Sequence, residues 1–248
     1  MKNTEDFKGM MDLATVRLYK GIDKSLTPDD ARNGFLVQRG KRTIVITAAH
    51  EMELDDHWFV DMNINKGHSS VHAPLNGLMR WWRADLSTDK DPEELDIAWA
   101  DLDMSAFSKL LLAEGWDPKE PLPIYPYIGP IETPKEDTLY GFHALSKVDI
   151  DANLRLVFPI FATEVDLRYT HVDPIKDVYV FDMAREHQGH PYYKGASGCP
   201  IANEEGQIVS ILLGGNSEEN ILWGAKLTDY DRMWDTEFKV PEPSVDPK

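Results

Sequence analysis

The sequence predicts an all-β protein made of two antiparallel β-barrels, with one short helix near the C-terminal end. Most of the 248 residues fall in short runs that alternate apolar and polar residues, which is the pattern of half-buried strands. These runs form two groups, separated by a proline-rich stretch at 118–134. Near the end of the chain, apolar residues recur at helical spacing instead.

The N-terminal group opens with a strand at 14–19, and the polar stretch at 20–33 predicts a loop. A hairpin should follow, because the apolar runs 35–37 and 44–46 flank Gly40. The rest of this group comprises strands at 57–64, 78–87 and 95–102 and a short helix at 105–116.

The stretch at 118–134 contains six prolines. Proline supplies no N–H to a strand ladder, so this stretch predicts an extended connector rather than a central strand. We therefore divide the chain into an N-terminal barrel at 12–117, the connector at 118–134, and a C-terminal barrel at 135–240 that includes the helix.

The C-terminal group again consists of short apolar runs separated by turn residues. The predicted strands lie at 137–142, 153–165, 177–183, 199–203, 206–215 and 222–227. The spacing of four apolar residues places them on one face of the closing helix. These residues are Leu227, Tyr230, Trp234 and Phe238.

Composition excludes several classes of partner. The formal net charge is −17, from 43 acidic and 26 basic residues. Such a surface repels phosphate backbones and anionic lipids, so we expect neither nucleic-acid nor membrane binding.

The histidine pairs His68/His72 and His187/His190 lie in polar stretches punctuated by glycine or proline. There we expect solvated loops rather than a metal site, and no cofactor is implied.

The cellular location is an expectation from two observations. Cys199 is the single cysteine of the sequence, so no disulfide can form within it. The first residues include acidic side chains and lack the apolar core of a signal peptide. We therefore expect a cytoplasmic protein.

The segment "GASGCP" at 195–200 surrounds Ser197 with small residues. Gly195 and Gly198 can simply form a turn between two strands. Alternatively, the turn presents Ser197 as a nucleophile, with backbone N–H groups directed at a developing oxyanion. The segment alone does not decide, because a serine hydroxyl needs an adjacent base to become nucleophilic.

Two upstream residues are candidates for the base and its orienting group. His50 ends the strand "TIVITAAH", where two alanines leave space beside the imidazole. Asp96 lies in "LDIAWADL" and directly precedes apolar residues, so we expect a half-buried carboxylate at the start of a strand. Such a carboxylate needs a hydrogen-bond donor, and an imidazole Nδ1–H would serve. The rivals Asp91, Asp101 and Asp103 do not stand before "IA".

The motifs "TAAH", "DIA" and "GxSGxP", in the order His50, Asp96 and Ser197, resemble those of the trypsin-like serine peptidases with the chymotrypsin fold. The nearest form is the bacterial, disulfide-free one. The resemblance covers residues 14–238, although the segments between the motifs match the family only in their pattern of short strands. It implies two six-stranded barrels packed face to face, with the site in the cleft between them.

The resemblance also implies an activity, serine endopeptidase, and a role for each residue. His50 would be the general base, Asp96 would orient it, and Ser197 would attack a peptide carbonyl of a polypeptide substrate. The N–H groups of Gly195 and Ser197 would bind the oxyanion. The substrate-binding residues would be Pro191, Tyr192, Leu213, Gly214 and Gly215.

Three positions depart from the family pattern. Ala196 stands where many members have an aspartate that pairs with a freed N-terminus, so we expect no activation cleavage. Glu51 stands where secreted members commonly have cysteine. Pro191 stands where an acidic residue would select arginine or lysine, so we expect an apolar or small residue before the scissile bond.

Two alternatives to a peptidase stay open. One is a binding or regulatory module with the same fold and a blocked cleft, and the other is an esterase with the same acyl chemistry. A regulatory partner protein is a further expectation, because a cytoplasmic peptidase must be restrained. The G-x-S-x-G motif of α/β-hydrolases is not present here, because Cys199 occupies its last position. We expect Cys199 to be a small packing residue.

Overall fold

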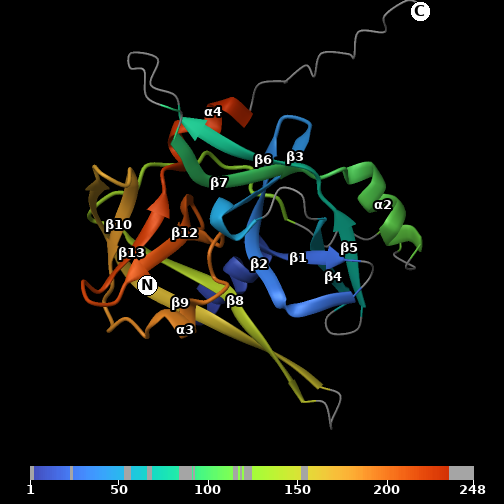
Figure 1. Ribbon diagram of the computed structural model, residues 1–248, viewed down its shortest axis with the longest axis horizontal. Helices are drawn as coiled ribbons and strands as arrows, with labels where there is room; N and C mark the ends of the chain where they lie inside the picture. The colour runs from blue at the N-terminus through green and yellow to red at the C-terminus, as the bar shows by residue number, and fades with distance from the viewer. Residues whose placement is uncertain are drawn as a thin grey trace, which may run out of the picture.

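Two β units make up the protein, and they lie beside one another (Figure 1). The computed structural model describes residues 3–22, 25–52, 57–65, 69–83, 91, 93–113, 117, 119, 125–151 and 156–234. The N-terminal unit is a seven-stranded antiparallel sheet in the order β5-β4-β1-β2-β3-β7-β6. Its strands are β1 (Thr15–Ile22), β2 (Ser25–Arg39), β3 (Arg42–Thr47), β4 (Trp58–Asn65), β5 (Ser69–Pro74), β6 (Asn76–Arg83) and β7 (Glu93–Asp101).

The C-terminal unit is a closed six-stranded barrel in the order β10-β13-β12-β11-β8-β9. Its strands are β8 (Leu139–Asp151), β9 (Leu156–Asp173), β10 (Val178–Asp182), β11 (Pro200–Asn203), β12 (Ile208–Asn216) and β13 (Ile221–Ala225). The predicted all-β class with two antiparallel units is confirmed. The N-terminal unit has seven strands where six were implied, and within the described residues only the C-terminal unit closes into a barrel.

The prediction of a loop at 20–33 is wrong. β1 runs to Ile22, β2 begins at Ser25, and these two residues face each other in the antiparallel register. A strand ladder is built from backbone N–H and C=O groups, so pairing can continue through a polar stretch when a neighbouring strand supplies the partners. The hairpin predicted around Gly40 is confirmed, and Gly40 has the left-handed φ of +55° that its turn requires.

A helix that the sequence pattern did not predict, α1 (Thr4–Ala14), precedes β1. Asn3 caps it, because its side-chain oxygen accepts the N–H of Glu5 at 3.1 Å. Phe7 and Met11, one helical turn apart, are both buried. They belong to a core cluster with residues of both β units, so this helix is held by tertiary packing.

The helix predicted at 105–116 is α2 (Met104–Ala113), which lies on the outer side of the N-terminal unit (Figure 1). Asp103 caps it by accepting the N–H of Ser105 at 2.9 Å. Its position and its cap therefore follow from the local sequence.

The predicted short C-terminal helix is confirmed, within described residues that end at Trp234. A 3-10 turn, η2 (Leu227–Asp229), leads into one turn of helix, α4 (Asp231–Trp234), and Phe238 lies outside the described residues. The side chain of Arg39 in β2 donates to Asp231 at 2.6 Å. This ion pair ties the C-terminal segment back to the N-terminal unit.

The connector runs along β2. The N–H of Tyr127 donates to the carbonyl of Leu36 at 2.8 Å, and the N–H of Gln38 donates to the carbonyl of Tyr127 at 2.9 Å. Proline does not interrupt these bonds, because they use other residues of the connector. The predicted boundaries of the two barrels and the connector stay predictions.

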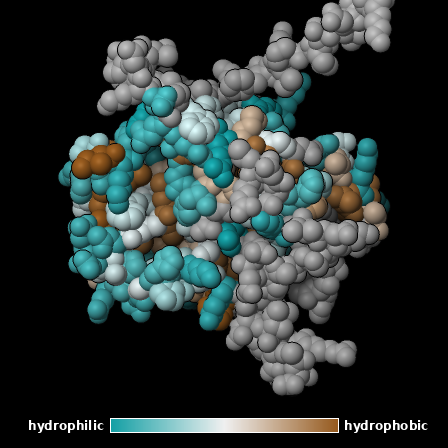
Figure 2. Space-filling view, viewed as in Figure 1, coloured by the Kyte–Doolittle hydropathy of each residue, from teal (hydrophilic) through white to brown (hydrophobic). Residues whose placement is uncertain are grey.

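The surface over the C-terminal barrel is mainly hydrophilic, and hydrophobic residues gather there in separate patches (Figure 2). A mainly hydrophilic surface is consistent with the formal net charge of −17. Within the part of the chain that the structure describes, no helix has the length and apolar character to cross a membrane.

Candidate active site

His50 follows β3 directly, on the 3-10 turn η1 (Ala49–Glu51). Ala48 and Ala49 are buried, and their small side chains let the turn pack closely against the core. The His50 side chain, in contrast, is 42% exposed. The end of β3 thus presents an accessible imidazole from a rigid support.

Asp96 in β7 fixes the orientation of His50. Its Oδ1 accepts the backbone N–H of His50 at 2.8 Å, and its Oδ2 lies 2.6 Å from Nδ1 of the ring. One carboxylate therefore holds both the backbone and the ring of His50. Because the carboxylate can only accept, Nδ1 carries the proton and Nε2 holds the lone pair of the neutral ring.

Ser197 faces the same cavity as His50, from the C-terminal barrel. The cavity has a volume of about 300 Å³, and His50, Gly195 and Ser197 are part of its lining. The Ser197 hydroxyl is half-buried and donates to the carbonyl of Leu213 at 3.5 Å, which is a weak bond. An imidazole–carboxylate pair from one β unit and a hydroxyl from the other therefore meet at one cavity.

Asn33 joins the two β units behind the serine turn. Its side chain is buried, and its Nδ2 donates to the carbonyls of Gly195 at 2.6 Å and Leu145 at 2.8 Å. Its Oδ1 accepts the N–H of Leu145 at 3.2 Å, and its own carbonyl accepts the Thr47 hydroxyl at 2.6 Å. This buried amide is fully hydrogen-bonded, and one of its bonds fixes the segment just before Ser197.

A second hydroxyl orients the peptide group that precedes Gly195. Ser146 Oγ donates to the carbonyl of Tyr192 at 2.6 Å and also lies 3.3 Å from the carbonyl oxygen of Lys194. In a trans peptide the C=O and N–H groups point in opposite directions, so the N–H of Gly195 points away from Ser146. Among the described residues, no protein acceptor takes the N–H of Gly195 or of Ser197. Two donors are therefore available to an oxyanion.

Gly198 shows why the serine turn needs glycine. Its φ is +85°, in the left-handed region. A Cβ at this position would collide with the carbonyl oxygen of Asn33 and with Oγ1 of Thr47. The turn that carries Ser197 consequently rests directly on the strand that leads to His50.

Cys199 is fully buried in the core of the C-terminal barrel, which confirms the expected packing role. Burial raises the pKa of its thiol, because the thiolate is poorly solvated there. The thiolate is the reactive form of cysteine, so this thiol is a poor rival to Ser197.

Comparisons with known proteins support the fold. No protein-family model matches the sequence, and no curated protein matches it by sequence. Many solved structures match, and two of them match over nearly the whole length of both chains. Neuropsin, a serine protease expressed in the limbic system of mouse brain, is 14% identical, with a TM-score of 0.57 over 91% of this chain and 94% of its own. A mutant of human heparin binding protein (CAP37) is 13% identical, with a TM-score of 0.56 over 96% of each chain.

The chain has the chymotrypsin fold. At these identities the comparisons show the fold and leave the chemistry to the site itself.

The five predicted substrate-binding residues lie in two different places in the structure. Leu213, Gly214 and Gly215 are part of the lining of this cavity. Pro191 and Tyr192 are not among the described residues that line it, because a single helical turn, α3 (His190–Tyr193), redirects them. Pro191 is exposed, and the Tyr192 hydroxyl accepts the N–H of Thr163 at 3.2 Å on β9.

The cavity lining includes residues that were not predicted, among them His187, His190, Tyr193 and Lys194. His187 lies in a loop and is half-buried, whereas His190 begins α3 and is exposed, and both belong to the wall of this cavity. Their position just before the serine turn is the sequence signal from which they could have been predicted.

Of the other histidine pair, His72 lies in β5 and His68 lies outside the described residues. Within the described residues, no cluster of three or more side chains could hold a metal ion.

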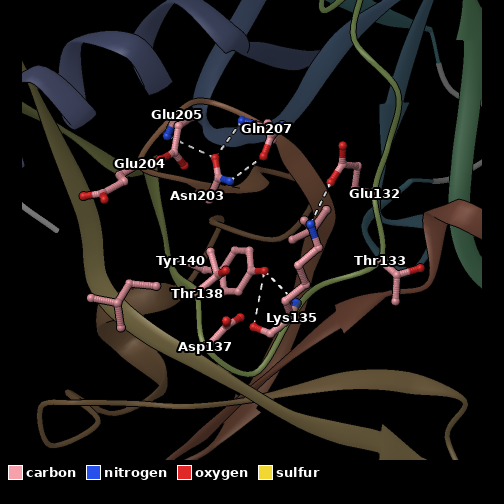
Figure 3. A pocket seen from close by; sticks show the side chains of 12 residues that line it. Glu132, Thr133, Lys135, Asp137, Thr138, Tyr140, Asn203, Glu204, Glu205 and Gln207 are labelled. Carbon is pink, nitrogen blue, oxygen red and sulfur yellow. Dashed lines mark hydrogen bonds and ion pairs between the residues drawn. The ribbon is translucent and has the colours of Figure 1, made fainter.

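A second cavity, of about 410 Å³, lies between the connector and the turn after β11 (Figure 3). Its carboxylate residues are Glu132, Asp137, Glu204 and Glu205. Polar groups in it bond to one another: the Tyr140 hydroxyl accepts the N–H of Lys135 at 2.7 Å, and Lys135 Nζ lies 3.7 Å from Glu132. Among the described residues it contains no serine or cysteine beside a histidine, unlike the cavity at Ser197.

Proposed function

We propose that this protein is a serine endopeptidase that uses His50, Asp96 and Ser197. The observation that carries the proposal is the 2.6 Å contact between His50 Nδ1 and Asp96, made at the cavity that Ser197 also faces. That contact leaves Nε2 as the proton acceptor on the ring. The available N–H groups of Gly195 and Ser197 support the same assignment.

In the proposed first step, Ser197 Oγ bonds to the carbonyl carbon of the scissile peptide and its proton passes to His50 Nε2. The carbonyl oxygen becomes an oxyanion, which accepts hydrogen bonds from the N–H groups of Gly195 and Ser197. Asp96 stabilises the imidazolium through Nδ1. The C–N bond then breaks, and the leaving amine takes the proton from Nε2.

In the second step, water attacks the acyl-serine ester. His50 Nε2 takes a proton from the water, and the same two N–H groups bind the second oxyanion. The C–O bond to Ser197 breaks, the serine regains its proton, and the carboxylic acid leaves. Each atom transferred comes from substrate, water or these residues.

The proposed substrate is a polypeptide in the cytoplasm. The sequence supports that location, because its single cysteine, which is buried, cannot form an internal disulfide. A peptidase there needs restraint, and a regulatory partner protein is part of the proposal.

Labelling with a fluorophosphonate, which reacts with activated serines, tests the proposal. The wild-type protein should form one adduct, and peptide mapping should place it on Ser197. Ser197→Ala and His50→Ala should lose it. Ser105→Ala is a matched control, because Ser105 is exposed on α2, and its adduct should persist.

Absence of any adduct would favour a binding module. A labelled protein that hydrolyses esters of short acids but no peptide in a library would be an esterase. Turnover of library peptides at internal bonds would support the endopeptidase.

A further inference from the structure

The cavity beside Ser197 contains several side chains that donate hydrogen bonds and no described carboxylate. His187, His190 and Lys194 lie in its wall, together with the backbone of Gly214 and Gly215. No aspartate or glutamate is part of the described lining. A buried ligand group is stable only when the cavity wall complements its charge and its hydrogen bonds. The composition of this wall therefore favours a ligand group that accepts hydrogen bonds.

His187 is held in a fixed orientation. Its backbone N–H donates to Asn220 Oδ1 at 2.8 Å, and its Nδ1 accepts the N–H of Gly189 at 3.0 Å. Its ring packs edge-on against Tyr193, with 4.6 Å between the ring centroids. A ring fixed at both its backbone and Nδ1 can present only Nε2 to the cavity.

The Nε2 atom of His187 is a donor that lacks a protein acceptor. Burial lowers the pKa of His187, which favours the neutral ring. Because Nδ1 accepts a hydrogen bond, the proton of the neutral ring lies on Nε2. Within the described residues, no acceptor bonds to that N–H. Nε2 lies beside Gly215, 3.0 Å from where a Cβ would stand, so glycine there leaves room for a ligand.

Lys194 supplies positive charge at the same cavity. Its carbonyl is held near Ser146, and its ammonium group forms no ion pair among the described residues. The carboxyl group of Glu164 lies behind Tyr193, whose hydroxyl donates to it at 2.6 Å, and it is not part of the lining. The nearby carboxylate is thus occupied by a donor and separated from the cavity by an aromatic ring.

We propose that this cavity selects a side chain that ends in a carboxylate, so that cleavage follows glutamate or aspartate. This inference rests on the proposed function, because the selected residue is the one whose carbonyl Ser197 attacks. His187 Nε2–H would donate to the carboxylate, and Lys194 would provide the opposite charge. This replaces the expectation of an apolar or small residue, which depended on Pro191 lying in the wall of the cavity.

The test uses one peptide series that differs only at the residue before the scissile bond: Glu, Gln, Leu or Lys. We expect the wild-type kcat/KM for Glu to exceed those for Leu and Lys by at least about tenfold, because a site built around a donor rejects side chains that leave it unpaired. His187→Leu should reduce the Glu/Leu ratio by at least about tenfold. Lys194→Gln should reduce the Glu/Gln ratio. His171→Leu, an exposed histidine on β9, is the matched control and should leave both ratios unchanged.

The outcomes separate this inference from the proposed function. Preference for Leu or Lys, or a Gln rate equal to or above the Glu rate, would overturn the selection of a carboxylate while leaving Ser197 as the nucleophile. An unchanged Glu/Leu ratio in His187→Leu would overturn the role of His187. If no peptide is cleaved and the fluorophosphonate does not label Ser197, the proposed function itself fails. Melting temperatures of the variants would show that changed ratios do not come from unfolding.

Discussion

Asn33 Nδ2 in the N-terminal sheet donates to the carbonyl oxygen of Gly195, in the C-terminal barrel, at 2.6 Å. These residues are 162 positions apart in the chain. The bond fixes the peptide that leads to Ser197, while Thr47, near His50, donates to the carbonyl of the same asparagine. One buried asparagine therefore links the segment before Ser197 to the strand that leads to His50.

Asn33→Ala should reduce peptide hydrolysis by about 10- to 100-fold, less than the loss from removing an oxyanion donor directly. The reason is that the Gly195 carbonyl would lose its donor and the turn would shift. The fold should lose about 1–3 kcal/mol from unsatisfied buried groups. The measurement is kcat and KM well below the melting temperature.

Asn203→Ala is the matched control for Asn33. Asn203 is also a buried asparagine with several hydrogen bonds, but it is the last residue of β11 and lines the second cavity. We expect it to lower stability with little change in kcat. Equal rates for Asn33→Ala and the wild type would show that the Asn33 bond does not position the serine turn.

Gly198→Ala should destabilise the protein by at least about 2 kcal/mol, because overpacking and a left-handed φ act together. Gly40→Ala provides the comparison. Gly40 also has a positive φ, but a Cβ there would meet no atom within 4 Å, so the expected loss is about 1–2 kcal/mol from backbone strain alone. Urea unfolding of both variants measures the difference, and an equal loss would mean that the close packing of Gly198 has no energetic effect.

Much of the fold could be predicted because strand alternation is a local property. The hairpin around Gly40, the strand that precedes His50 and the strand that contains Asp96 follow from apolar runs and turn residues. Helix α1 could not be predicted in this way. Its apolar residues Phe7, Met10 and Met11 lie at helical spacing, but the contacts that stabilise the helix come from residues far away in the chain.

The candidate site was predicted in part. Sequence motifs brought His50, Asp96 and Ser197 together. The structure places His50 and Ser197 at one cavity and Asp96 in contact with the His50 ring, while their catalytic roles stay a proposal. The position of Pro191 could not be predicted, because one turn of helix changes the direction of every side chain in that segment. The role of Asn33 depends on partners more than 100 residues away, which no local pattern shows.

Phe7→Ala should lower the free energy of unfolding by about 3–5 kcal/mol, the usual effect of removing a buried aromatic side chain. Phe7 is 3% exposed and packs in the core shared by the two units. Leu13→Ala, on the same helix but with Leu13 58% exposed, should change stability by less than about 0.5 kcal/mol. Similar values for the two variants would mean that α1 does not pack as described.

His143 should make the protein less stable as the pH falls. Burial is the main cause that lowers its pKa below 6.5, opposed by the carboxylate of Asp12, whose Oδ1 lies 3.4 Å from Nε2. The unfolded chain then takes up the proton first, so stability decreases as pH falls through about 6.5 and levels off below the folded pKa. Melting curves from pH 8 to pH 5 should show a smaller decrease for His143→Gln. An equal decrease in both proteins would remove His143 as the cause.

The central claim is that Ser197 is the nucleophile, and the most direct measurement compares kcat/KM for one peptide in Ser197→Ala and Cys199→Ala. We expect Ser197→Ala to keep the fold and to lose hydrolysis by about 10⁴-fold or more, because covalent catalysis disappears while the oxyanion donors remain. Cys199→Ala should keep a rate of the same order as the wild type, because the buried thiol only packs. Hydrolysis that survives in Ser197→Ala and disappears in Cys199→Ala would contradict the account.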